Sequence, residues 1–308
     1  MQLGEMMNKN FLSVNDWDSL EHIEFINLTE QVRKGNYSNV LQDKNIALVF
    51  EKASLRTRVS FEVGIKKLGG NAIYLNNDDI GIGKRESVTH IAKNLDRWVD
   101  GVVARVFNHS TLINFTQNIN VPIINALSDL EHPCQALADM YTIYKQFNKF
   151  DDVNFTYIGD GNNIAASLSL IAAHLGMNFT YSSPMKYQIP SNIFQEAKTI
   201  ANSKETKMDW YENPTKAVNE ADVIYTDKWV SMGMESEQKI RIKDFKGYQV
   251  TKELISSANK NVLIMHDMPA KEGEEIEEGI IDSEISLAFE QAENRLHSQT
   301  ALLYKLYS

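Results

Sequence analysis

Short apolar runs alternate with amphipathic stretches along most of this chain, from about Asn45 to about Asp267. Segments with an apolar period of about 3.6 residues, typical of amphipathic helices, include Arg56–Leu68, Glu86–Trp98 and His132–Phe147. Alternation of strands and helices favours right-handed crossover units and parallel sheets. The pattern therefore predicts an α/β fold with two doubly wound parallel-sheet domains. Eight runs are predicted as strands, four on each side of the last of these helices: residues 45–50, 71–75, 101–107, 121–127, 154–160, 178–183, 222–227 and 261–267.

The polar segment at residues 147–154 is the best boundary between the two domains. A length of 308 residues suits two domains of about 150 residues each. We expect residues 1–148 to form the first domain, residues 149–285 to form the second, and a C-terminal helix at residues 286–308 to pack back on the first. Because ligands of open parallel sheets bind at the carboxyl ends of the strands, the active site is expected in a cleft between the domains.

Composition narrows the choice of partners and compartment. The 31 basic and 41 acidic residues give a net charge of −10 without a basic run, so nucleic acids and anionic membranes are not expected partners. No apolar run approaches the roughly 20 residues that cross a bilayer, and the N-terminus lacks a signal-peptide core. The one cysteine suits a reducing compartment, so a soluble cytoplasmic protein is expected. The 7 histidines form no ligand-spaced cluster, so no metal is predicted.

A candidate anion site follows the first strand. Ser54 is a good N-cap residue, and a helix start offers free N–H groups and a positive dipole end. Arg56, Thr57 and Arg58 add charged and hydroxyl donors, which together could hold a phosphate. The competing interpretation is an ordinary capped helix with arginines in solvent, and this segment alone favours neither.

This segment resembles the Ser-Thr-Arg-Thr-Arg phosphate motif of the aspartate and ornithine carbamoyltransferases, with Leu55 in place of the usual threonine. Six motifs of that family occur in the same order over essentially the whole chain. The other five are an arginine at a strand end (Arg105), His-Pro-x-Gln (132–135), Gly-Asp-x-Asn-Asn (159–163), the ornithine-specific loop Asp-x-x-x-Ser-Met-Gly (227–233), and a closing motif around Arg295.

The resemblance implies a set of residues that bind carbamoyl phosphate, among which Arg105, His132 and Gln135 are also expected to be catalytic. Taken alone, Arg105 could equally be an ion-paired structural residue, and the His-Pro pair a simple helix cap. Cys134 is interpreted as a packed side chain rather than a nucleophile. The residues expected to bind carbamoyl phosphate are Ser54, Leu55, Arg56, Thr57, Arg105, His132, Gln135, Met268 and Arg295.

The second half of the chain is expected to bind ornithine through Asn163, Asp227, Ser231 and Met232, again by resemblance. A carboxylate at a strand end, such as that of Asp227, can pair with the α-ammonium group of an amino acid. The two asparagines at 162–163 could instead only cap a helix. The segment is not a dinucleotide-binding loop, because an isoleucine occupies the third glycine position.

Asp267 is the main departure from the family, which carries His-Cys-Leu-Pro where this chain has His-Asp-Met-Pro at 266–269. A carboxylate near a phosphate dianion is repelled unless a cation lies between them. The reacting ammonium group or Lys228 could be that cation. Our hypothesis is that Asp267 binds the amine end of the substrate and helps to accept its proton. Alternatively, Asp267 turns away and main-chain carbonyls hold the amine.

The loop Asp79–Glu86 corresponds to a segment that, in the family, reaches the active site of a neighbouring subunit in a homotrimer. The usual donor of that loop falls on Gly81 here, so Lys84 is our candidate for completing the neighbouring site.

The resemblance therefore implies transfer of the carbamoyl group of carbamoyl phosphate to the side-chain amine of L-ornithine. The products would be L-citrulline and phosphate, as in arginine biosynthesis, and no cofactor is needed. Two alternatives remain open. One is carbamoyl transfer to another amine, such as putrescine, lysine or an acylated ornithine. The other is a non-catalytic paralogue that only binds carbamoyl phosphate or an amino acid.

Overall fold

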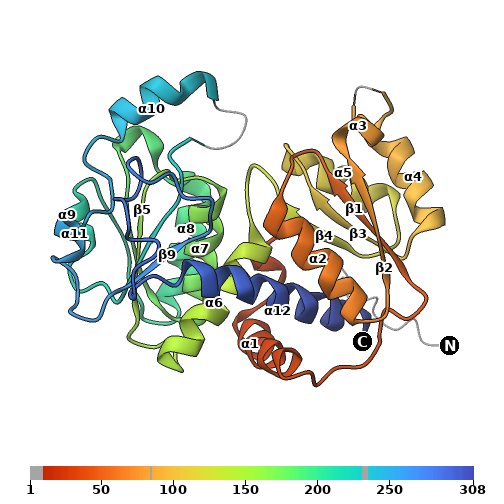
Figure 1. Cartoon of the computed structure of the whole chain (residues 1–308), viewed down its shortest axis with the longest axis horizontal. Helices are drawn as coiled ribbons and strands as arrows, with labels where there is room; N and C mark the ends of the chain where they lie inside the picture. The colour runs from red at the N-terminus through yellow and green to blue at the C-terminus, as the bar shows by residue number, and fades with distance from the viewer. Residues whose placement is uncertain (1–9, 84, 231–234) are drawn as a thin grey trace. The chain divides into compact units, whose positions relative to one another are not determined.

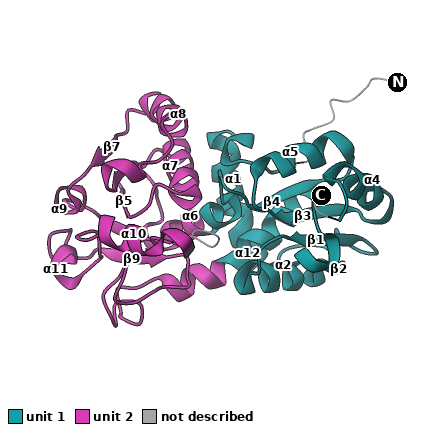
Figure 2. Cartoon of the chain, turned by 90° about the horizontal axis from the view of Figure 1, so that it is seen from above, with its two compact units in different colours: residues 1–138, 295–308 teal, residues 139–294 magenta. Residues whose placement is uncertain are grey.

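The computed structural model of this chain describes residues 10–83, 85–230 and 235–308 (Figure 1). The chain divides into two compact units, which Figure 2 colours separately. The first unit contains Met1–Ala138 and Arg295–Ser308, and the second contains Asp139–Asn294. The division falls inside the helices α6 (Pro133–Phe147) and α12 (Ala288–Tyr307), so each helix contributes residues to both units. The domain boundary expected after residue 148 stays a prediction.

The first unit contains a parallel four-stranded sheet in the order β2-β1-β3-β4. The strands β1, β3 and β4 are almost continuously buried, as expected for parallel strands covered on both faces, whereas the edge strand β2 is partly exposed. Apolar side chains of α4 and α5 form a core with those of β1 and β3, and α2 lies on the other side of the sheet (Figure 1). The strands are β1 (Asn45–Phe50), β2 (Asn71–Asn76), β3 (Gly101–Arg105) and β4 (Ile123–Leu127). The helices are η1 (Val14–Asp16), α1 (Ser19–Arg33), α2 (Leu55–Lys67), α3 (Asn77–Ile80), α4 (Val88–Trp98) and α5 (His109–Asn118).

The second unit contains a parallel five-stranded sheet in the order β7-β6-β5-β8-β9. The strand β7 was not among the predicted strands, because it is a short edge strand whose sequence, Met-Asp-Trp-Tyr, has no continuous apolar run. The strands are β5 (Asn154–Ile158), β6 (Asn178–Ser182), β7 (Met208–Tyr211), β8 (Val223–Thr226) and β9 (Leu263–His266). The helices are α7 (Asn163–Leu175), η2 (Met185–Tyr187), α8 (Ser191–Asn202), α9 (Pro214–Ala217), η3 (Glu235–Glu237), α10 (Gln238–Asp244) and α11 (Lys252–Ile255).

The prediction of an α/β fold with two parallel sheets is confirmed. Three predicted helices, together with the C-terminal one, correspond to α2, α4, α6 and α12 with ends shifted by a few residues. The helix α5 was not predicted as a separate element. Among the described residues, no helix combines the length and the apolar character needed to cross a bilayer.

The strand order fixes where each unit can bind a ligand. The chain leaves β1 and β3 in opposite directions in the first sheet, and β5 and β8 in opposite directions in the second. A crevice opens at the carboxyl ends of the strands at such a switch point, and ligands of open α/β sheets bind there. The predicted site residues Ser54 and Arg105 follow or end β1 and β3, while Asn163 and Asp227 follow β5 and β8.

Candidate functional site

The start of α2 forms one side of the candidate anion site in the first unit. Ser54 is its N-cap, and the Ser54 hydroxyl accepts a hydrogen bond of 3.3 Å from the N–H of Thr57. The first turn contains no acidic residue, so the positive end of the helix dipole is not compensated within that turn. The side chain of Leu55 is 74% exposed, which leaves its main-chain N–H as the group it can offer to a ligand.

Arg295 joins three elements of the first unit at this point. Its side chain is almost completely buried and donates from Nη2 to the hydroxyl of Thr57 (3.1 Å), from Nε to Oε1 of Gln299 (2.7 Å), and from Nη1 to Oε1 of Gln135. These three acceptors are uncharged side chains from α2, α12 and α6. Their hydrogen bonds therefore orient the guanidinium group without supplying a counter-charge.

His132 lies immediately before α6 and is buried together with Arg105, the last residue of β3. Burial lowers the pKa of His132 well below its usual value, and the positive charges of Arg295, Arg105 and Arg56 lower that pKa further. The imidazole is therefore neutral at physiological pH and carries one N–H. The charges of three arginines from α12, β3 and α2 thus act on a neutral histidine, a combination that suits an anionic ligand with a carbonyl group.

Cys134 is fully buried in the same region, and its thiol donates a hydrogen bond of 3.3 Å to the carbonyl oxygen of Asn125. Burial raises the pKa of Cys134 to about 12. The group is therefore a protonated thiol rather than a nucleophilic thiolate, as the interpretation of a packed side chain requires.

The start of α7 and the end of β8 meet in the second unit. Asn162 caps α7, because its Oδ1 accepts from the N–H groups of Ile164 (2.9 Å) and Ala165 (3.2 Å). Its Nδ2 donates to Oδ2 of Asp227 at 2.8 Å, and the N–H of Lys228 donates to Oδ1 at 2.6 Å. Two neutral donors therefore fix the buried Asp227 carboxylate. Asn163, the predicted ligand, is the first residue of α7 and is half-buried.

Asp267 follows β9 and lies beside Asp227. One side-chain atom from each of Asp227, His266 and Asp267 lies within 4.8 Å of the other two. Burial, together with nearby carboxylates that include Asp227 and Asp267, raises the pKa of Tyr157 and of Tyr225 well above the usual value. The second unit therefore presents a buried cluster of carboxylates, a group that suits a cation.

The same three residues include a histidine and two carboxylates, which are types that bind divalent metals. However, both ring nitrogens of His266 are already engaged. Nδ1 accepts from the N–H of Met268 at 2.9 Å, and Nε2 lies 3.1 Å from Oε1 of the buried Glu275. A metal would have to displace one of these contacts, and the expectation that no metal is bound stays a prediction.

The remaining predicted residues fall in three places. Met268, expected to contact carbamoyl phosphate, lies in the second unit with a left-handed φ of 59°, before a cis Met268–Pro269 peptide bond. Gly81 ends α3 in a left-handed conformation, and a Cβ atom there would lie 2.8 Å from Cβ of Arg85, which explains the glycine sterically. Lys84, Ser231 and Met232 lie outside the described residues.

Sequence reasoning missed an ion pair that supports the second pocket. Arg241 of α10 donates from Nη1 to Oδ2 of Asp160 (2.7 Å) and to the carbonyl oxygen of Trp229 (3.1 Å). Burial raises the pKa of Asp160 to about 6, although Arg241 acts to lower it. The pair connects α10 to the end of β5 across 81 residues of sequence, a separation at which no local pattern signals a contact.

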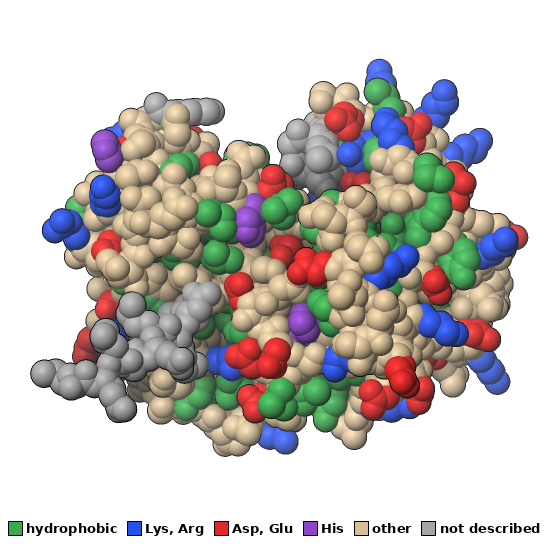
Figure 3. Space-filling model, turned by 180° about the vertical axis from the view of Figure 1, so that it is seen from behind, with side chains coloured by type: hydrophobic (Ala, Val, Ile, Leu, Met, Phe, Trp, Pro, Cys, Tyr) green, Lys and Arg blue, Asp and Glu red, His purple; other side chains and the backbone are tan. Residues whose placement is uncertain are grey.

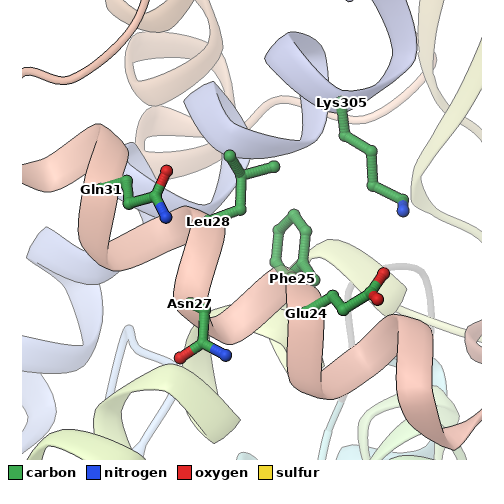
Figure 4. Close-up of a pocket in the computed structure, with 6 residues that line it drawn as sticks. All are labelled: Glu24, Phe25, Asn27, Leu28, Gln31 and Lys305. Atoms are coloured by element: carbon green, nitrogen blue, oxygen red, sulfur yellow. The ribbon is translucent and has the colours of Figure 1, made fainter.

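Two surface features lie apart from these residues. A shallow pocket of about 370 Å³ in the first unit is formed by α1 and the end of α12 (Figure 4). It contains none of the predicted site residues. The pocket is lined by Glu24, Phe25, Asn27, Leu28, Gln31 and Lys305.

On the face shown in Figure 3, acidic and basic side chains are interspersed, which agrees with the absence of a basic run in the sequence.

Comparison with known proteins agrees with this geometry. Residues 9–145 match the aspartate/ornithine carbamoyltransferase carbamoyl-P binding domain, and residues 151–306 match the Asp/Orn binding domain of the same family. The chain is 43% identical to an ornithine carbamoyltransferase of Archaeoglobus fulgidus, over 97% of both chains, and 42% identical to one of Oceanobacillus iheyensis, over 99% of this chain and 96% of the relative.

Solved structures give the same picture. The ornithine carbamoyltransferase of Pyrococcus furiosus superposes with a TM-score of 0.92 at 38% identity, covering 98% of this chain and 97% of that one. The anabolic ornithine carbamoyltransferase of Campylobacter jejuni gives a TM-score of 0.91 at 36% identity, covering 96% and 98%. With both domains matched over nearly the whole length, this chain belongs to the aspartate/ornithine carbamoyltransferase family.

Proposed function

We infer that this chain transfers the carbamoyl group of carbamoyl phosphate to the side-chain amine of L-ornithine, giving L-citrulline and phosphate. The observation that carries this inference is the opposite charge of two groups of residues. The positive charges of three arginines act on His132 in the first unit, whereas two carboxylates lie beside His266 in the second. A negatively charged pocket favours the diamino acid ornithine over aspartate, whose second carboxylate it would repel.

In the proposed mechanism, the first unit binds carbamoyl phosphate. The N–H groups at the start of α2 and the side chains of Arg56 and Arg295 hold the phosphate. Arg105 and the neutral His132 donate to the carbonyl oxygen, on which negative charge develops when the tetrahedral intermediate forms. Gln135, whose Oε1 accepts from Arg295, holds the carbamoyl group in place. Ser54 and Thr57 complete the phosphate site.

The second unit presents the amine. Asp227 pairs with the α-ammonium group of ornithine, and Asn163, Ser231 and Met232 add hydrogen bonds to the amino-acid backbone. Asp267 faces the side-chain ammonium and takes its proton. The neutral amine then forms a bond to the carbonyl carbon, the bond from that carbon to the phosphate oxygen breaks, and the second proton of the amine passes to the departing phosphate. Orientation of two substrates in this way contributes up to about 7–11 kcal/mol to catalysis.

Purified protein incubated with carbamoyl phosphate and a panel of amines tests this function. Colorimetric detection of the ureido product is expected with ornithine and not with aspartate, putrescine, lysine or N-acetylornithine. Product from one of the other amines, and none from ornithine, would reassign the acceptor. Binding of carbamoyl phosphate without any ureido product would identify a non-catalytic paralogue.

We also propose that the active protein is a cytoplasmic homotrimer in which the loop carrying Gly81 and Lys84 completes the site of a neighbouring subunit. One support is an apolar stripe on the outer face of α2, where Leu55, Val59 and Val63 are 74%, 46% and 37% exposed. Oligomers commonly cover such surfaces. Light scattering after size exclusion is expected to give three times the 35.0 kDa of one chain.

Activity recovered on mixing two inactive variants tests the sharing of sites. Arg56→Ala and Lys84→Ala trimers, mixed and allowed to exchange subunits, are expected to form some sites that carry neither substitution. A mixture that stays inactive after demonstrated exchange would place Lys84 in the site of its own subunit.

A further inference from the structure

Four buried groups, none of them assigned to a substrate, form a hydrogen-bonded network in the second unit. Gln291 of α12 donates from Nε2 to Oδ1 of Asp139 (2.7 Å) and to the hydroxyl of Tyr225 (3.0 Å). Its Oε1 accepts from the main-chain N–H of His266 at 3.0 Å. Tyr225 in turn donates to Oδ2 of Asp139 at 3.1 Å. All four side chains are fully buried.

The network leaves the Gln291 amide only one orientation. Its oxygen must face the main-chain N–H of His266, which can only donate, and its nitrogen must face the Asp139 carboxylate, which can only accept. Burial and the nearby Asp139 carboxylate raise the pKa of Tyr225 well above its usual value, so its hydroxyl keeps the proton that it donates. Each hydrogen bond of the network therefore has a donor and an acceptor.

The two strands that this network joins carry the carboxylates of the amino-acid pocket. Tyr225 is on β8, two residues before Asp227, and His266 ends β9, immediately before Asp267. Buried polar networks in which every group is satisfied hold their members rigidly, whereas removal of one partner leaves the others unsatisfied. A change at Gln291 therefore acts on the separation of Asp227 and Asp267 without touching either.

We propose that Gln291 is a positioning residue that sets the spacing of Asp227 and Asp267 for the ornithine amine, by tying the end of β9 to Asp139 and Tyr225. This inference rests on the proposed function. It assigns no direct contact with substrate to Gln291 and concerns the amino-acid pocket rather than the phosphate site.

Steady-state kinetics of three variants test the proposal. Gln291→Met keeps the side-chain length and removes every hydrogen bond, and it is expected to raise KM for ornithine at least tenfold and to lower kcat. KM for carbamoyl phosphate is expected to stay within twofold, because the arginines proposed to hold it lie in the first unit. Gln291→Glu places a carboxylate against that of Asp139 and is expected to be at least as damaging. The matched control, Gln195→Met, changes an exposed glutamine of α8 and is expected to behave like the wild type.

The double variant Asp139→Asn/Gln291→Glu reverses the direction of one hydrogen bond. The amide introduced at position 139 can donate to the carboxylate introduced at 291, which still accepts from His266. We expect it to recover at least tenfold in kcat/KM for ornithine over Gln291→Glu alone. If a substitution only reduced the amount of folded protein, and Asp227 and Asp267 kept their positions, the apparent kcat would fall and KM for ornithine would not change. The recovery of KM in the double variant is therefore the informative measurement.

Separate outcomes overturn the inference and the function beneath it. Wild-type KM for ornithine in a folded Gln291→Met protein, or no recovery in the double variant, would overturn the role of Gln291. If Gln291→Met does not fold, Tyr225→Phe removes one hydroxyl from the same network and is expected to raise KM for ornithine three- to tenfold; no change would again overturn the role. Wild-type protein that makes no citrulline would overturn the proposed function itself.

Discussion

Replacement of Asp267 by asparagine removes one negative charge from the amino-acid pocket and hardly changes the size of the side chain. The side chains of Asp227 and Asp267 have oxygens within 4.8 Å of each other. Two unit charges about 5 Å apart interact by roughly 3 kcal/mol at an effective dielectric constant of about 20. The side chain of Asp267 is 14% exposed, and screening by solvent reduces this to about 1–2 kcal/mol.

The charge of Asp267 is expected to destabilise the free protein and to stabilise the complex with ornithine. Without ligand the two carboxylates repel each other, so the free energy of unfolding of Asp267→Asn is expected to exceed that of the wild type by about 1 kcal/mol. The variant would then unfold at a higher urea concentration. With ornithine bound, each carboxylate faces an ammonium group, and the side-chain ammonium is attracted to Asp267. The same substitution is therefore expected to lower kcat/KM for ornithine by about 5- to 30-fold, the equivalent of about 1–2 kcal/mol.

Urea unfolding without ligand and steady-state kinetics with ornithine measure the two effects. Asp282→Asn changes an exposed aspartate of the same unit and serves as the matched control, with neither quantity altered. Asp267→Cys also lacks the charge at neutral pH and is expected to follow the asparagine variant. If Asp267→Asn has the kcat/KM of the wild type, the charge has no role and main-chain carbonyls hold the amine instead.

Three further predictions follow from single sites. The pKa of His132 is lowered in the folded state, so below about pH 6.5 the unfolded chain binds more protons than the folded one. The free energy of unfolding, measured with urea, is therefore expected to decrease between pH 7 and pH 5. In His132→Gln this decrease is expected to be smaller, because the histidine no longer contributes to it. Arg295→Lys keeps the charge but loses the planar fork, so kcat/KM for carbamoyl phosphate is expected to drop by about 100-fold, while the exposed Arg97→Lys leaves it unchanged. A Cβ atom at Gly161 would lie 2.2 Å from main-chain atoms of a neighbouring segment, so Gly161→Ala is expected to lose about 1–3 kcal/mol of stability in thermal unfolding, and a wild-type melting temperature would contradict the packing.

Local patterns in the sequence were enough to predict the framework that positions the site. Buried strands of a parallel sheet are continuous apolar runs, so β1 and β3 were visible in the sequence, and the N-cap Ser54 was recognised by its residue type. The edge strand β7 was missed because only one of its four residues is buried and its sequence resembles a loop. Its place in the sheet depends on pairing with β6, which is a tertiary contact.

The contacts that shape the two pockets were harder to predict for the same reason. The hydrogen bond between Asn162 and Asp227 spans 65 residues, and that between Gln291 and Asp139 spans 152. Neither residue pair has a local signature, since an asparagine at a helix start and a glutamine in a helix are ordinary residues. The family resemblance suggested Asn163 as a ligand and did not suggest Asn162 as the residue that holds Asp227 in place.

The only cysteine of the chain, Cys134, is buried, and its thiol donates a hydrogen bond to a main-chain carbonyl oxygen. At the position where the family carries a cysteine, close to the reacting amine, this chain has the carboxylate of Asp267. Peroxides, electrophiles and mercury compounds attack accessible thiolates, and a carboxylate does not react with them in this way. Carbamoyl transfer by this protein is therefore expected to withstand oxidants and electrophiles that react with accessible thiolates.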